Sequence, residues 1–196
     1  MIDQGKLVAA KSLPMERGQA ESLMPLLEEL LTEAGGKSFS DITLIACGTG
    51  PGNFTGTRIS VAAARGLALA LGIKAVGVSL LEAAAHNRPL PCLVALDARR
   101  GESYVQRFGE GAVGPALLAA DQPLPSEGTA CRIGTAEAFR ADPLAQPLPA
   151  PEALCEAMAE IASLRANDDA ALRPAPLYLR AADAAPPREP PPVILP

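Results

Sequence analysis

A strand, a glycine-rich loop and a helix follow one another between residues 42 and 71, and this order constrains the fold more than any other feature. The apolar run 42–47 is typical of a buried strand, and the Ala-rich run 59–71 is typical of a helix. A second apolar run at 73–78 predicts another strand after that helix. Strand, helix and strand within about forty residues form a βαβ unit, which implies parallel strands and an α/β fold.

The loop between strand and helix reads GTGPGNFTGTR over residues 48–58. Its glycines permit positive φ and close approach to a ligand, and N–H groups at the positive end of a helix dipole commonly hold a phosphate. Neither the lysine of a Walker-type loop nor GxGxxG spacing is present, so a tight structural turn is an equal alternative. Arg58 could neutralise a phosphate or tie the loop to a carboxylate. The candidate phosphate or nucleotide residues are Gly50, Pro51, Gly52, Asn53, Phe54, Thr55, Gly56 and Arg58.

Composition narrows the class of protein. A net charge of −5 over 196 residues argues against binding tRNA alone through a basic surface. No window holds 18 uncharged apolar residues, and the first residues lack the regions of a signal peptide, so neither a membrane span nor a leader is expected. Four dispersed cysteines without a CxxC pair predict reduced thiols. We therefore expect a cytoplasmic protein.

The residues give little support to catalysis. His86 is the single histidine, and with dispersed cysteines it cannot build an ordinary zinc or iron site, so no metal site is predicted. Ser79 lacks a GxSxG setting, which leaves no serine triad, and His86 is expected at a helix end on the surface. We predict no catalytic residue.

Polar residues around 97–104 admit two interpretations. Asp97 ends an apolar strand and could hold a metal or activate water, but a turn cap paired with Arg99 or Arg100 is favoured. Glu102 and Tyr104 alternate onto one face of the next strand and could contact a partner, although a hairpin explains them as well.

The rest of the chain divides into two lobes and a tail. We predict a strand remnant at 7–10, helices at 21–34, 80–85 and 151–164, and a hairpin of strands 92–96 and 102–108, whereas 109–150 is too rich in Gly, Pro and Ala to assign. The first helix carries apolar residues at three- and four-residue spacing, and the Ala-rich helix is apolar nearly all round, which predicts burial on most sides. The expected parts are residues 1–89, residues 90–183 and a Pro-rich flexible tail, 184–196. The apolar stripe of the first helix consists of Leu23, Leu26, Leu27, Leu30 and Leu31.

The amino-acid sequence of the loop resembles that of a known protein family. GTGPGNFTGTRIS, followed by ARGLALALGIKAVGVSLLEAAA, LVALDARRGESYVQRF and PLYLR, is similar in matching order to the signature of the TsaB (YeaZ) family. The resemblance touches roughly half of the chain directly. It implies an actin/hsp70/sugar-kinase-like (ASKHA, ribonuclease H-like) fold of two lobes. It also implies a non-catalytic subunit of a complex with TsaD and TsaE.

That complex, by resemblance, transfers threonylcarbamoyl from its adenylate to N6 of the adenosine beside the anticodon of tRNAs reading codons that begin with A. ATP or ADP and a metal ion would belong to the partner subunits, and tRNA would be contacted through the complex. This chain would dock on TsaD, or form a homodimer when TsaD is absent, through its first helix and the Ala-rich helix. The implied interface residues are Leu23, Met24, Leu27, Leu30, Ala63 and Leu67.

The sequence departs from the family at its start. The family's first strand, ILAIDTS-like, has no counterpart, so we expect an incomplete first lobe and either an upstream start codon or a damaged chain. Gln19 and Ser60 stand where relatives usually have histidine and glycine. Two alternatives remain open. One is a stand-alone enzyme, either a nucleotide-binding ASKHA kinase or a glycoprotease-like peptidase; the other is an interaction module without a role in tRNA modification.

Overall fold

The predicted βαβ unit forms the centre of the first lobe. The computed structural model describes residues 1–15, 17–167 and 173–180. Strands β3 (Leu44–Gly48) and β4 (Lys74–Val78) run parallel and in register, joined by α2 (Phe54–Leu71). The helix begins at Phe54 rather than Ile59, because the Asn53 carboxamide accepts a hydrogen bond from the Gly56 N–H at 2.9 Å and caps the first turn. Residues 54–58, expected in the loop, are therefore helical.

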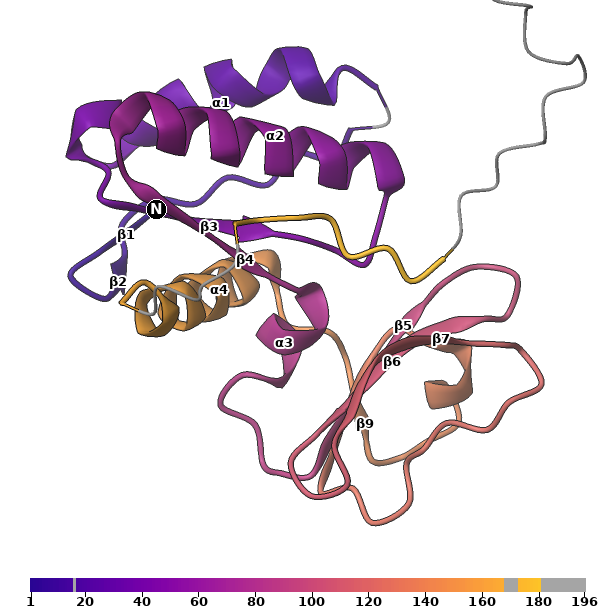
Figure 1. Cartoon of the computed structure of the whole chain (residues 1–196). Helices are drawn as coiled ribbons and strands as arrows, with labels where there is room; N and C mark the ends of the chain where they lie inside the picture. The colour runs from indigo at the N-terminus through magenta and orange to yellow at the C-terminus, as the bar shows by residue number, and fades with distance from the viewer. Residues whose placement is uncertain (16, 168–172, 181–196) are drawn as a thin grey trace, which may run out of the picture.

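Helices cover both faces of this two-stranded sheet (Figure 1). Helix α1 (Gln19–Glu33) packs on α2 on one side, and α4 (Pro151–Arg165) packs on β3 and β4 on the other. Both helices agree closely with their predicted ranges. The strand remnant expected at 7–10 is instead a short hairpin of β1 (Ile2–Asp3) and β2 (Lys6–Leu7), and the turn η1 (Phe39–Asp41) precedes β3.

Helix α3 (Leu80–Ala85), predicted with the same bounds, connects the lobes. Ser79 and Glu82 cap its start reciprocally, the Ser79 Oγ accepting from the Glu82 N–H at 3.0 Å. Glu82 also pairs with Arg165 of α4 at 2.5 Å. Helix α4 comes from the second half of the chain, yet it lies against β3, β4 and α3. The division near residue 90 stays a prediction, and α4, which follows it in the sequence, packs against elements that precede it.

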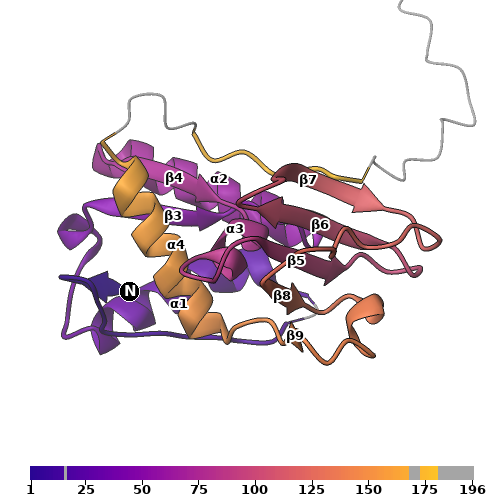
Figure 2. The same ribbon diagram turned by 90° about the horizontal axis from the view of Figure 1, so that it is seen from below.

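The second lobe is a mixed five-stranded sheet in the order β7-β6-β5-β8-β9 (Figure 2). The predicted hairpin is confirmed, with β5 and β6 antiparallel. The segment that could not be assigned from sequence supplies β7, β8, β9 and the turn η2. The bounds are β5 (Cys92–Asp97), β6 (Ser103–Phe108), β7 (Val113–Leu118), β8 (Cys131–Gly134), η2 (Glu137–Phe139) and β9 (Ala145–Gln146).

Strand β5 is buried on both faces, as a central strand requires. On one face Val94 joins a core that continues through Leu81 of α3 to Ile161 of α4. On the other face Leu93 packs with Val105 and Phe139. Because the first of these cores includes residues of both lobes, the two lobes share one continuous apolar interior.

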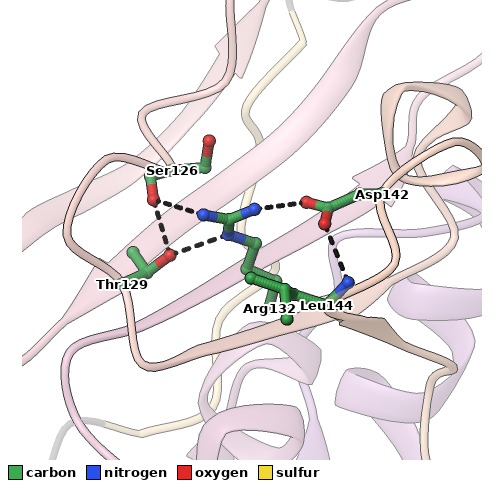
Figure 3. A network of polar contacts seen from close by, with 5 residues as sticks. All are labelled: Ser126, Thr129, Arg132, Asp142 and Leu144. Carbon is green, nitrogen blue, oxygen red and sulfur yellow. Dashed lines mark hydrogen bonds and ion pairs between the residues drawn. The ribbon is translucent and has the colours of Figure 1, made fainter.

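Arg132 joins two connections at one edge of the second lobe (Figure 3). Arg132 of β8 donates to the Thr129 Oγ1 at 3.0 Å, to the Ser126 carbonyl at 3.2 Å and to the Asp142 carboxylate at 2.6 Å. Asp142 in turn accepts from the Leu144 N–H at 2.9 Å. The guanidinium therefore ties the connection before β8 to the connection before β9.

Residues 173–180, here called the strap, run from the first lobe to the second (Figure 2). The Leu177 N–H donates to the Thr49 carbonyl at 2.8 Å, beside the end of β3. At the far end the Arg180 guanidinium donates to the Ala98 carbonyl at 2.6 Å and pairs with Glu102. The strap thus fastens the glycine loop to the turn between β5 and β6. The predicted tail 184–196 lies outside the described residues.

Candidate functional site

Backbone hydrogen bonds join the start of the glycine loop to other segments of the protein. The Thr49 N–H donates to the Val78 carbonyl at 2.9 Å, and the Gly50 carbonyl accepts from the Leu80 N–H at 2.7 Å. Gly50 adopts φ 93°, which favours glycine. Pro51 is buried, whereas Gly52 is exposed. The loop therefore joins β4, α3 and the strap. A phosphate role for Gly50, Gly52 and their neighbours stays a prediction.

Among the described residues, Arg58 pairs with no carboxylate, and its phosphate role stays a prediction. Its Nε donates to the Tyr178 hydroxyl of the strap at 2.6 Å, and its Cζ lies 3.8 Å from the centroid of the Phe54 ring. Asn53 caps α2, and Thr55 is exposed on the first turn beside Gly56. Arg58 thus stacks on an aromatic ring at the start of α2. Sequence reasoning missed Tyr178, since the contact spans 120 residues and no local pattern signals it.

The turn after β5 agrees with the favoured interpretation of Asp97. Its carboxylate accepts from the Arg99 backbone N–H at 2.9 Å and so caps the turn. Arg99 and Arg100 both adopt positive φ, at 64° and 54°, and lie exposed at the tip. The Arg180 guanidinium donates hydrogen bonds to the Tyr104 hydroxyl and the Glu102 carboxylate, and these bonds raise the pKa of Arg180. Tyr104 and Glu102 therefore share one face, directed at the strap.

His86 ends α3, as expected, and its Nε2 lies 2.7 Å from the Glu160 carboxylate of α4. Within the described ranges, no three His, Cys, Asp or Glu side chains are grouped so that they could hold a metal ion. None of the described helices is both long and apolar enough to cross a bilayer.

The cysteines are free thiols in this structure. Cys47, Cys92 and Cys131 are buried, and Cys155 is exposed on α4. Burial raises the pKa of Cys47 to about 11, and burial beside Cys131 raises that of Cys92 to about 12. The Cys47 and Cys92 thiols therefore resist ionisation at neutral pH.

The implied interface residues on α1 and α2 occupy two different settings. Met24 is exposed, at 38% of its surface. Five others are half-buried within the chain itself, namely Leu23, Leu27, Leu30, Ala63 and Leu67. Leu30 faces a hollow of about 90 Å³ that Leu7 and Cys155 also line. The apolar stripe of α1 therefore contributes in part to packing of this chain.

Helix α2 is less buried than its composition predicts. Only Val61, Ala64 and Ala68 are buried, on the side facing the sheet. An outer ridge, formed by Ala62, Arg65, Gly66 and Leu69, is exposed, and Leu69 keeps 85% of its surface. The ridge residues recur at three- and four-residue spacing, which places them on one face of the helix. Because α2 is apolar nearly all round, the sequence did not show that this face is exposed.

A second hollow lies in the other lobe, away from the glycine loop. It has a volume of about 160 Å³ and opens at the ends of β8 and β9, where Thr135, Arg140 and Gln146 line it. Gly134 beside it has no room for a side chain, since an added Cβ would lie 1.8 Å from the Ala95 carbonyl oxygen.

Comparison with known proteins shows which family this chain is similar to. Residues 14–125, more than half of the chain, match the model of the family described as TsaD: tRNA N6-adenosine threonylcarbamoyltransferase. The chain is 40% identical to the tRNA threonylcarbamoyladenosine biosynthesis protein TsaB of Escherichia coli over 93 residues, which cover 45% of this chain and 40% of that protein. It therefore aligns with less than half the length of that relative.

Longer matches agree with this assignment. An uncharacterized protein of Mycobacterium tuberculosis is 36% identical over 178 residues, covering 87% of this chain and 79% of that protein. The structure of YeaZ from Pseudomonas aeruginosa superposes with a TM-score of 0.61 at 30% identity, covering 82% of this chain and 85% of that one. The expected ASKHA-like α/β fold is confirmed. The chain belongs to the TsaB (YeaZ) family.

Proposed function

We propose that this chain acts in the formation of threonylcarbamoyladenosine on tRNA, as a non-catalytic subunit that binds TsaD. The names of its TsaB relatives support the process, and the exposed outer ridge of α2 supports the docking role. TsaE would join through the complex. The transferred group would pass from threonylcarbamoyl-AMP to N6 of the adenosine beside the anticodon, with ATP or ADP and a metal ion held by the partner subunits.

The outer ridge is the observation that carries this proposal. Ala62 and Gly66 leave the backbone of α2 open to close approach by another helix, and Leu69 offers apolar area that water now covers. Removing such area from water contributes roughly 25 cal/mol per Å². Arg65 on the same ridge favours a partner helix that carries carboxylates. A homodimer through this face is the arrangement expected in the absence of TsaD.

The experiment uses cells depleted of their own TsaB and supplied with this chain, with threonylcarbamoyladenosine in tRNA measured by mass spectrometry. The chain is expected to restore the modification, and Leu69→Glu or Met24→Glu to abolish both restoration and capture of TsaD. Thr32→Glu is the matched control, since it adds the same charge to another exposed position on α1, two turns away from Met24. Restoration by Leu69→Glu and Met24→Glu at full level would refute the docking surface.

Leu27→Glu tests the inner stripe separately. Because Leu27 is half-buried within the chain, its effect on folding must be measured by urea unfolding beside its effect on TsaD binding. A variant that unfolds at the wild-type urea concentration but no longer binds TsaD would place Leu27 in the interface. A variant that unfolds early would place it in the packing of this chain.

A further inference from the structure

Two of the six aromatic side chains of this chain are exposed, and they lie together. Phe54 keeps 44% of its surface and Tyr178 keeps 49%, whereas the four other rings are buried or half-buried. The two ring centroids are 5.2 Å apart and the rings are tilted by 39°. They come from the start of α2 and from the strap. A water-exposed aromatic pair assembled from distant segments calls for a reason beyond core packing.

The guanidinium of Arg58 lies over the Phe54 ring and also reaches Tyr178. Its Cζ lies 3.8 Å from the Phe54 centroid and 5.5 Å from that of Tyr178, and its Nε donates to the Tyr178 hydroxyl at 2.6 Å. Throughout the described part of the chain, Nε is the only atom of this guanidinium that makes a hydrogen bond. Arg58 is exposed, so its two terminal amino groups keep donors for a ligand.

The surroundings are positive and polar. Helix α2 contains two arginines and no acidic residue, and its positive N-terminus lies at Phe54. The strap leads from Tyr178 to Arg180, which pairs with Glu102 and contacts the turn that carries Asp97, Arg99 and Arg100. With Arg58, four arginines stand against two carboxylates here, in contrast with the net charge of −5 for the whole chain.

We propose that Phe54, Arg58 and Tyr178 form a platform for a single-stranded RNA segment, with a base stacked on the rings and a phosphate bound by Arg58. Every base has a π-face, and stacking on an aromatic side chain contributes about 1–3 kcal/mol per base. A planar guanidinium offers paired donors that match a phosphate. The inference rests on the proposed function, in which the RNA is the substrate tRNA.

The neighbouring residues favour RNA over a protein partner. Gly52, Asn53 and Thr55 flank Phe54 in the sequence, and all three are exposed and lack a large apolar side chain. A protein-docking surface would place aromatic residues within a wider apolar patch. Such a patch lies further along α2, around Leu69, so the two surfaces are separate on the same helix.

The test measures binding of a fluorescein-labelled single-stranded heptaribonucleotide to the full chain at low salt, by fluorescence anisotropy. Phe54→Leu keeps apolar bulk but removes the π-face, and it is expected to raise Kd about tenfold, the equivalent of about 1.4 kcal/mol of stacking. Phe54→Trp is expected to restore binding. Arg58→Lys is expected to raise Kd because the charge stays while the planar donors are lost. Leu164→Ala, exposed on α4, is the control and is expected to bind normally.

Three results would overturn the inference. These are an absence of heptanucleotide binding, equal binding by wild type and Phe54→Leu, or competition by free AMP at concentrations equal to those of the RNA. Phe54→Leu that keeps RNA affinity but loses TsaD would assign the rings to the protein interface instead. The proposed function would survive each of these results, since it is refuted separately by full modification with Leu69→Glu and Met24→Glu.

Discussion

Arg132 and Asp142 form an ion pair at 2.6 Å that joins two connections of the second lobe. The hydrogen bond from Arg132, together with the Leu144 N–H, holds the pKa of Asp142 below its ordinary value of 3.8. Because the pKa of Asp142 is lower in the folded than in the unfolded protein, its charge stabilises the fold at any pH above the unfolded-state pKa. This stabilisation is lost as the pH falls through the folded-state pKa.

Asp142→Asn is therefore expected to lower the urea midpoint of unfolding at pH 7. The amide can still accept from the Leu144 N–H, so the change removes mainly the charge. The difference from wild type should shrink as the pH falls below about 4, where the wild-type carboxylate begins to take up its proton. Glu137→Gln, in an exposed pair with Arg140 at 3.4 Å, is the control and should change the midpoint little. A difference that is constant from pH 7 to pH 2 would contradict the role of the charge.

Gly134→Ala is expected to destabilise the protein severely. Gly134 adopts φ 148°, and an added Cβ would lie 1.8 Å from the Ala95 carbonyl oxygen of the neighbouring strand, so the end of β8 would have to move away. A loss of more than about 3 kcal/mol in the free energy of unfolding is expected. Gly114→Ala in β7 meets no atom within 4 Å and serves as the control. Equal urea midpoints for the two variants would show that β8 can shift at little cost.

Gly66→Ala should act in opposite directions on folding and on assembly. Gly66 is an exposed residue inside α2, with no neighbouring atom within 4 Å of an added Cβ. Alanine is favoured over glycine in a helix by about 0.8–1 kcal/mol, so the isolated chain should become more stable. If a partner helix packs closely on the outer ridge, the methyl group should weaken binding of TsaD in a titration. Unchanged affinity for TsaD would show that the partner helix does not pack closely on Gly66.

Alkylation should distinguish the four thiols. The thiolate is the reactive form, and burial raises the pKa of Cys47 and Cys92 to about 11 and about 12. Iodoacetamide at pH 8 is therefore expected to modify Cys155 first in the native protein and all four cysteines in urea, as read by peptide mass spectrometry. Rapid native modification of Cys92 would mean that β5 opens readily.

The sequence predicted correctly those helices and strands that are marked by residues close together in the chain. The bounds of α3 were correct, since Ser79 and Glu82 form a capping box at fixed spacing. The start of α2 was placed too late, because the glycines obscured Asn53 as its cap. Strands β8 and β9 could not be predicted, since they have four and two residues and β8 pairs with the distant strand β5. Strand β7 forms a hairpin with β6, but Gly114 and Pro115 within it are not typical of a strand.

The candidate site was predicted only in part, for the same reason. Residues Gly50 to Arg58 could be selected from the loop, but the contact of Arg58 with Tyr178 depends on where the strap crosses the first lobe. The apolar stripe of α1 was visible, yet sequence alone could not separate packing within the chain from an interface. Leu27 is half-buried and Met24 exposed, and this difference depends on the elements that pack against α1 in the folded chain.

The strap is the last described segment to be synthesised, so its contacts form late in folding. A chain leaves the ribosome from its N-terminus, so β3, β4 and the hairpin β5–β6 emerge well before residues 173–180. Until Leu177 reaches Thr49 and Arg180 reaches Glu102, the glycine loop and the turn between β5 and β6 are not tied to each other through the strap. A premature stop codon just before Pro174 would therefore yield a polypeptide that carries every strand and helix described here, and the core shared by the lobes, but not this outer connection.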